Sequence, residues 1–241
     1  MLIKLIYTEL KKLKRSPIWL AFLFIPIVPA VLGTLNYMNN LELLQDGWYD
    51  LWTQHTLFTC YFFLPVTLGI YCSYLMRLEH GNRNWNKLLS APVRIWEIYV
   101  SKLASASVML ILSEVWIAVL YVASGYIIGL PREFPLELIN WTLGGILGGA
   151  VMLSLQLLIS LLIKSFALPV GISLVGGISG LVALAKGFGH IYPYSLMAYG
   201  MESNAPQKLL ESGYAPFIVV SLLWIAALTI IGSIAMSKAE L

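Results

Sequence analysis

Six long apolar stretches limit what this chain can fold into. They cover 132 of the 241 residues and contain one formal charge, that of Glu114. In lipid every backbone amide must be hydrogen-bonded within its own segment, so each stretch is expected to be a helix. The sequence therefore predicts an all-α, polytopic membrane protein that forms a single transmembrane domain over residues 1–241. The six predicted spans are 16–35, 53–76, 104–127, 141–163, 166–185 and 216–236.

The composition agrees with this prediction and excludes several other protein classes. Hydrophobic residues make up 59% of the chain and charged residues 11%, whereas soluble domains average about 45–50% and about 25%. Six spans leave no length for a large soluble domain, a twelve-span carrier or a fused ATPase. The net charge of +3 is too small to suggest a nucleic-acid partner.

The distribution of lysine and arginine predicts which side of the membrane each connection faces. Twelve of the fifteen lie in the N-terminal segment, the 77–103 connection, the turn at Lys164 and the C-terminal tail. Arg132, Lys186 and Lys208 lie on the other side, which carries mainly acidic residues. Because basic connections stay in the cytoplasm, both termini are expected to be cytoplasmic.

Residues 1–15 have apolar residues at helical spacing, with lysines mostly on the opposite face. This pattern predicts an interfacial helix whose lysines point to anionic lipid headgroups. A basic tail that only fixes the orientation of the first span is the alternative.

The 77–103 connection is too long for a tight turn between two helices. A short amphipathic helix within 82–90 would present an apolar surface flanked by basic residues, a shape suited to docking on a cytoplasmic partner. The alternative is an amphipathic loop that rests on lipid. The candidate docking residues are Arg83, Asn84, Trp85, Lys87, Leu88 and Leu89.

The order of these segments resembles that of ABC-2 type ABC transporter permeases. The resemblance rests on a basic N-terminal helix, two spans, a connection with Glu79-x-Gly81, Leu88-Leu89-Ser90-Ala91-Pro92-Val93 and Lys102, and four further spans. It implies a non-enzymatic, multi-pass permease subunit of a bacterial cell membrane. It also implies a second permease, identical or homologous, and two copies of a separate ATPase that binds ATP and Mg. Residues 84–89 would be the coupling helix and residues 1–15 the elbow helix.

Within that class the chain is most similar to permease subunits of lantibiotic immunity exporters. The resemblance implies ATP-driven export of an amphiphilic antimicrobial peptide, and hence resistance to it. It also implies that residues 187–215 fold back into the outer leaflet as a re-entrant segment. Export of another hydrophobic cargo, such as a drug or a lipid-linked molecule, remains an alternative.

The motifs for nucleotide and metal chemistry are missing from the sequence. A Walker-type phosphate loop needs a Gly-Lys pair, which occurs nowhere in the chain. His55, His80 and His190 lie far apart, and Cys60 and Cys72 are too distant along one helix to form a disulfide. We therefore expect no catalytic residue, cofactor site or metal site on this chain, with ATP and Mg bound by the partner ATPase.

Glu114 lies near the middle of the third span, where an acidic side chain costs about 2.5–3.5 kcal/mol on insertion scales. It is a candidate polar residue of the translocation path, with His55, Ser113 and Gln156 as candidate neighbours. A protonated, hydrogen-bonded structural acid is the alternative interpretation. A proton-coupled carrier that uses Glu114 is a further hypothesis, although such carriers usually contain internal repeats.

Glycines and prolines in the spans predict helix packing and kinks. Gly144-x-x-x-Gly148, Gly145-x-x-x-Gly149 and Gly176-x-x-x-Gly180 would allow neighbouring helices to approach closely. Kinks are expected at Pro26, Pro29, Pro65 and Pro169.

Overall fold

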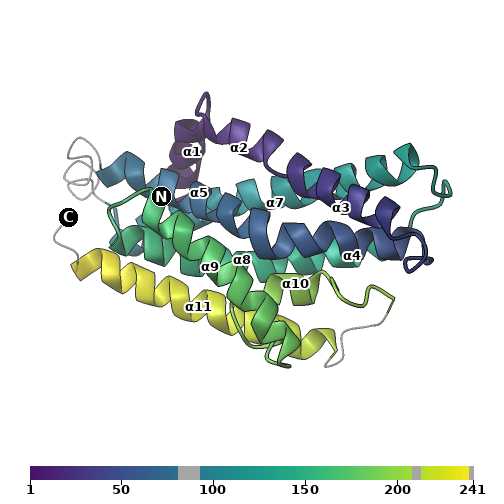
Figure 1. The fold of residues 1–241 in the computed structure, drawn as a ribbon. Helices are drawn as coiled ribbons and strands as arrows, with labels where there is room; N and C mark the ends of the chain where they lie inside the picture. The colour runs from purple at the N-terminus through teal and green to yellow at the C-terminus, as the bar shows by residue number, and fades with distance from the viewer. Residues whose placement is uncertain (81–92, 208–212, 239–241) are drawn as a thin grey trace.

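The computed structural model describes residues 1–80, 93–207 and 213–238, and every regular element in these ranges is helical. Figure 1 shows the helices as a bundle of long, roughly parallel elements. Their bounds are α1 Leu2–Leu13, α2 Ile18–Phe24, α3 Ile27–Asn39, α4 Trp48–Phe58, the π-helix η1 Thr59–Phe63, α5 Leu64–His80, α7 Ile95–Ile127, α8 Leu138–Leu162, α9 Ala167–Ala185, α10 Leu196–Gly200 and α11 Tyr214–Lys238.

Six helices are long and apolar enough to cross a membrane, which confirms the predicted number and order of spans. Four of them begin earlier than predicted, at Trp48, Ile95, Leu138 and Tyr214, and the difference is largest at Ile95. A helix does not have to stop where its apolar window stops, because its hydrogen bonds lie along its own axis. At the start of α7, the backbone N–H of Arg94 donates to Glu97, which caps the added turns.

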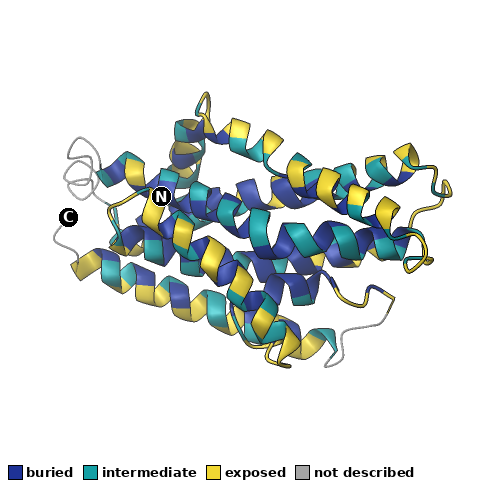
Figure 2. Ribbon diagram, viewed as in Figure 1, coloured by how far each residue is buried: buried dark blue, intermediate teal, exposed yellow. Residues whose placement is uncertain are grey.

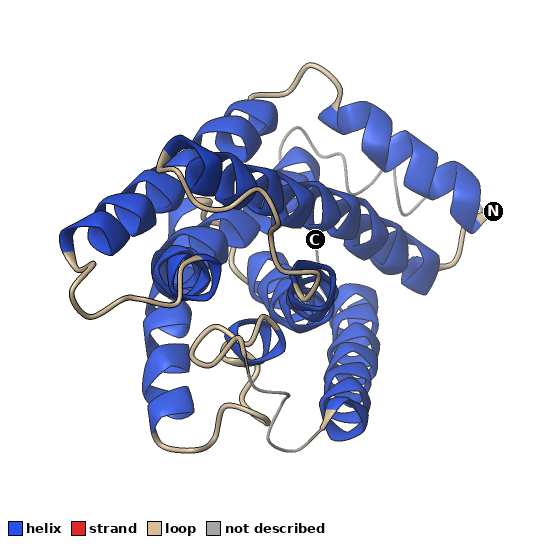
Figure 3. Ribbon diagram, turned by 90° about the vertical axis from the view of Figure 1, so that its right-hand side faces the viewer, coloured by secondary structure: helices blue, strands red, loops and turns tan. Residues whose placement is uncertain are grey.

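The first helix lies across one end of the bundle. Figures 1 and 3 show α1 running transverse to the long helices, next to the ends of α5 and α7. This arrangement fits the predicted helix over residues 1–15. Its Lys12, however, contacts carboxylates of the protein and not lipid headgroups.

Two of the four predicted kinks coincide with breaks in the helices. The α2–α3 span is interrupted at Pro26, and the π-helix η1 ends at Phe63, two residues before Pro65. Pro29 and Pro169 instead occupy the first turns of α3 and α9. The backbone nitrogen of a first-turn residue has no partner within its helix, so proline causes no kink there.

Large apolar side chains cover the outer surface of the bundle. Figure 2 shows exposed residues along the outward sides of α2, α3, α9 and α11. Examples are Leu20, Val175 and Leu223, each more than half exposed. A surface this apolar is suited to contact with lipid.

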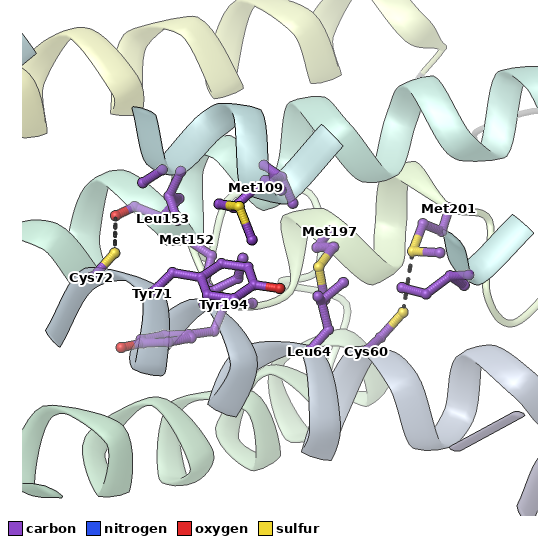
Figure 4. Packing of buried hydrophobic residues seen from close by; sticks show 14 of the residues in the cluster. Cys60, Leu64, Tyr71, Cys72, Met109, Met152, Leu153, Tyr194, Met197 and Met201 are labelled. Carbon is purple, nitrogen blue, oxygen red and sulfur yellow. Dashed lines mark hydrogen bonds between the residues drawn. The ribbon is translucent and has the colours of Figure 1, made fainter. Parts of the chain in front are cut away.

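Aromatic and sulfur-containing side chains fill the interior. Trp52 stacks on Trp141 with ring centroids 4.9 Å apart, and neither ring is exposed to solvent. Figure 4 shows tyrosine, methionine and cysteine side chains packed in the same core. Both cysteines, Cys60 and Cys72, are free and buried, as expected from their spacing.

Candidate functional site

Four charged side chains from three helices form an ion cluster where α1 meets the bundle. The cluster consists of Glu9 and Lys12 on α1, Glu79 on α5 and Lys102 on α7. The Lys102 ammonium lies 2.8 Å from Glu79 and 3.1 Å from Glu9. Lys12 donates to Glu9 at 2.7 Å and also to Glu79. Each cation contacts both carboxylates, so the two positive and two negative charges balance.

Helix geometry explains how the cluster assembles. Glu9 and Lys12 are three residues apart, which places them on the same face of α1. Glu79 is the penultimate residue of α5, and Lys102 lies about two turns into α7. The cluster therefore joins α1 to the two helices that flank the segment 81–92.

Burial makes any unpaired charge in this cluster costly in free energy. Lys102 is fully buried, and Glu9 and Glu79 are each 3% exposed. An unpaired charge in such surroundings costs several kcal/mol, so each member depends on the others. Burial alone would lower the pKa of Lys12, but the neighbouring carboxylates of Glu9 and Glu79 raise it above its usual value.

Sequence reasoning did not predict this cluster. It placed Lys12 on a face directed to lipid headgroups. It took Lys102 as a basic residue of a cytoplasmic connection and as part of the pattern that resembles ABC-2 permeases. The structure corrects both assignments, because Lys102 is buried in the bundle and Lys12 binds buried carboxylates. The available signal was the spacing of Glu9 and Lys12 on one helix face. The other contacts join distant parts of the chain, since Glu79 is 67 positions from Lys12 and 23 positions from Lys102.

The candidate docking residues lie outside the described residues. Arg83, Asn84, Trp85, Lys87, Leu88 and Leu89 all belong to the segment 81–92. Their assignment remains a prediction. The structure describes the two helices to which this segment is attached and the ion cluster that joins them to α1.

Glu114 is the second feature that carries chemistry. Its side chain is 1% exposed, and neither carboxyl oxygen has a hydrogen-bond partner among the described residues. The three candidate neighbours bond elsewhere: His55 to Thr34 at 3.0 Å, Ser113 to Tyr71 at 2.9 Å and Gln156 to the Pro169 carbonyl at 2.6 Å. The structure therefore shows no hydrogen-bond partner for this acid among the described residues, and its place in the translocation path stays a prediction.

Glycines of α8 make room for Glu114. A Cβ at Gly145 would lie 2.9 Å from Oε2 of Glu114, and one at Gly149 would lie 2.9 Å from the side chain of Leu110. Leu110 and Glu114 are one turn apart on α7, as Gly149 and Gly145 are on α8. This pair of glycines thus lets the two helices pack closely at the level of the acid, as the Gly145-x-x-x-Gly149 motif predicts.

The neighbouring glycine pair of α8 receives the segment that follows α9. A Cβ at Gly144 would overlap the backbone of Gly200, and one at Gly148 would overlap that of Leu196. These contacts hold the short helix α10 directly on α8, with Leu196 fully buried. Similarly, Gly176 and Gly180 of α9 leave space for Tyr194.

Hydrogen bonds fix the end of α10 in this position. The Trp52 indole donates to the Met201 carbonyl at 2.9 Å. Glu202 accepts hydrogen bonds from the Trp141 indole at 3.2 Å and from the Tyr214 hydroxyl at 2.6 Å. Sequence reasoning used the acidic residues of this side only to predict orientation and did not single out Glu202. The segment after α9 is therefore attached to α4, α8 and α11.

Among the residues that the structure describes, no group of three or more His, Cys, Asp or Glu side chains lies together in a way that could hold a metal ion. What the described part of the chain offers is a buried ion cluster at one end and a buried, unpaired acid within a closely packed bundle.

Comparison with known proteins adds one match. A family model described as ABC-2 family transporter protein matches residues 5–180. The matched region begins in α1, contains all four residues of the ion cluster and Glu114, and ends in α9. No curated protein matches the chain.

Proposed function

The chain belongs to the ABC-2 family of transporter proteins, and from that premise we propose that it is the permease subunit of an ATP-driven exporter. Membership of this family implies an ABC ATPase as partner. In the proposed assembly two copies of the ATPase bind ATP and Mg, and a second permease, identical or homologous, completes the membrane part. The chain lies in a bacterial cell membrane with both termini in the cytoplasm.

The ion cluster is the observation that carries this proposal. The predicted docking residues 83–89 lie between α5 and α7, and Glu79 and Lys102 tie these two helices to α1. A movement of the docking segment would therefore reach three helices together. Nucleotide binding on the partner can shift the bundle between two arrangements only if the ATPase binds one arrangement better than the other.

The proposed cargo is an amphiphilic antimicrobial peptide of the lantibiotic type. Its support is the resemblance of the chain to immunity permeases, together with the strongly apolar outer surface of α2, α3, α9 and α11. The core is filled by large side chains such as Trp52, Trp141 and Tyr121, none more than 1% exposed. We therefore place the cargo path between two permease subunits, where an amphiphilic peptide can enter from the membrane.

A proton-coupled carrier is the second candidate, and the unpaired Glu114 is the observation that favours it. Family membership argues against it, because ABC-2 proteins work with an ABC ATPase. ATP-independent uptake driven by a pH gradient in liposomes would support the carrier and contradict the exporter.

A docking variant tests the exporter directly. The chain is co-expressed with its ATPase, and survival is measured in cells challenged with a lantibiotic. Leu88→Asp should abolish protection and ATPase binding, since a charge would disrupt an apolar docking surface. Leu43→Asp is the matched control, because Leu43 is 83% exposed in a connection on the expected outer side. Normal ATPase binding by the Leu88 variant would contradict the docking assignment.

A further inference from the structure

Glu114 has surroundings that its role in packing does not explain. Both oxygens lack partners, and the adjacent residue of α8 is a glycine that leaves space for the carboxyl group. An ionised carboxylate without any hydrogen bond is strongly disfavoured in an apolar interior, so such a group exists there as the neutral acid.

Met201 lies beside the carboxyl group of Glu114. A Cβ at Gly145 would lie 2.8 Å from Cγ of Met201 and 2.9 Å from Oε2 of Glu114, so the two side chains meet at the same position on α8. Met201 directly follows α10, and its sulfur accepts a contact from the Cys60 thiol at 3.4 Å. The thioether thus closes the site from the side of the segment after α9.

Few other titratable groups share the middle of the bundle. Helix α8 has none, α11 has them only at its ends, and those of α4 other than His55 lie in its first turn. The charged residues of α5 lie near its end, and α1 reaches α7 at Lys102. The remaining groups are Tyr37 of α3, His55 of α4, Cys60 and Tyr61 of η1, Tyr71, Cys72 and Tyr74 of α5, Tyr99, Tyr121 and Tyr126 of α7, and Tyr194, Tyr199 and Glu202 of the segment after α9. Glu202 directly follows Met201 and is hydrogen-bonded to Trp141 and Tyr214.

No cation balances Glu114 within the described residues. Cys60 is close enough to interact with it electrostatically, but a thiol carries no positive charge. His55 and Tyr71 are hydrogen-bonded to Thr34 and Ser113. The proton itself is therefore what neutralises the carboxyl group.

We propose that Glu114 is a proton-binding site that controls whether the segment after α9 packs against α8, an arrangement called seated below. The carboxyl is neutral while Met201 covers it, and it releases its proton to water when Met201 withdraws. The seated arrangement binds one proton more than the open one, so acid favours seating and a rise in pH favours opening. The site deepens the proposed function, because this segment lies on the side expected to release cargo.

Infrared spectroscopy of the chain in nanodiscs tests the protonation state. A neutral carboxylic acid has a carbonyl stretch distinct from the bands of a carboxylate. We expect the wild-type protein to show this acid band at neutral pH, Glu114→Gln to lose it, and the exposed control Glu42→Gln to keep it. Identical spectra for the wild-type and Glu114→Gln proteins would overturn the proposal.

Thiol labelling tests the link to Met201. In a Cys72→Ala background, Cys60 is the only cysteine, and it is fully buried beside Met201. Its labelling rate should rise with pH more steeply when Glu114 is present than in Glu114→Gln, by up to about tenfold per pH unit, the limit for one linked proton. The Gln variant supplies the pH dependence of the thiol itself, and coinciding profiles would overturn the link.

Neither measurement uses ATP, a cargo or a partner. Failure of both would leave the proposed exporter intact. Conversely, a chain that binds no ATPase would contradict the exporter, while its acid band and labelling profile would still decide the role of Glu114.

Discussion

The ammonium of Lys102 lies 2.8 Å from the carboxylate of Glu79, although the two residues are 23 positions apart in the sequence. Between them lies the segment predicted to dock on an ATPase. Glu9 and Lys12 of α1 complete the charge balance. The same four groups thus hold three helices together and connect them to the only long cytoplasmic connection expected from the sequence.

Removing both charges of this pair should cost less than the sum of the losses from removing each one alone. Glu79→Gln leaves Lys102 buried with only Glu9 to balance both lysines, and we expect a loss of about 3–5 kcal/mol in the free energy of unfolding. The double variant Glu79→Gln, Lys102→Gln restores the balance and should be less destabilised than the sum of the single variants. Thermal unfolding in nanodiscs measures this difference. Strictly additive losses would mean that the two groups do not interact.

Lys12 should matter for coupling more than its neighbour Lys11. Lys12→Met removes the link from α1 to Glu79, whereas Lys11 is exposed and contacts only Tyr7 among the interactions described for it. With the ATPase bound, Lys12→Met should lower cargo-stimulated ATP hydrolysis, and Lys11→Met should not. Equal effects of the two substitutions would assign the role to general basic charge at the membrane surface.

The attachment of α1 should weaken at alkaline pH. The carboxylates of Glu9 and Glu79 raise the pKa of Lys12 above its usual value of 10.5. A raised pKa in the folded state means that the stabilisation is fully present below pH 10.5 and is lost as pH rises through the raised value. Unfolding midpoints of the wild-type and Lys12→Met proteins, measured from neutral pH upward, should therefore differ most at neutral pH and converge at alkaline pH. A difference in unfolding midpoint that stays constant with pH would show that the charge of Lys12 is not the source of the stabilisation.

The glycines of α8 and α9 should differ in their tolerance of a methyl group. A Cβ at Gly144 overlaps the backbone of Gly200, so Gly144→Ala should destabilise the seating of α10 by about 1–3 kcal/mol. Gly171 has open space around its Cβ position, and Gly171→Ala should be neutral or stabilise the helix by about 0.5–1 kcal/mol. Limited proteolysis of the 187–215 segment, alongside thermal unfolding, would show the difference. Similar proteolysis of both variants would contradict the close contact.

The apolar pattern of the sequence was sufficient to predict the six spans. A helix that crosses lipid needs a long apolar stretch and little else, so spans can be identified from local composition alone. The first-turn positions of Pro29 and Pro169 were not anticipated, because the effect of a proline depends on where its helix begins. That boundary is set by a few local residues and is less evident in the sequence.

The ion cluster could not be predicted in the same way. Charges at the ends of spans usually indicate orientation, and by that rule Lys12 and Lys102 are equivalent to any other cytoplasmic lysine. Their pairing depends on how α1 lies across α5 and α7, which is a tertiary arrangement. For Glu114 the sequence indicated the unusual position of the acid, but not its missing hydrogen bonds, because the partners of His55, Ser113 and Gln156 depend on tertiary packing.

The central claim is that this chain works as the membrane subunit of an ABC transporter whose ATPase acts through the ion cluster. The most direct measurement is purification of the tagged chain in nanodiscs together with its partners, followed by an ATPase assay on the complex. The account predicts a stoichiometric nucleotide-binding subunit with vanadate-sensitive turnover that becomes insensitive to cargo in Lys12→Met. A single polypeptide without ATPase activity would contradict the claim.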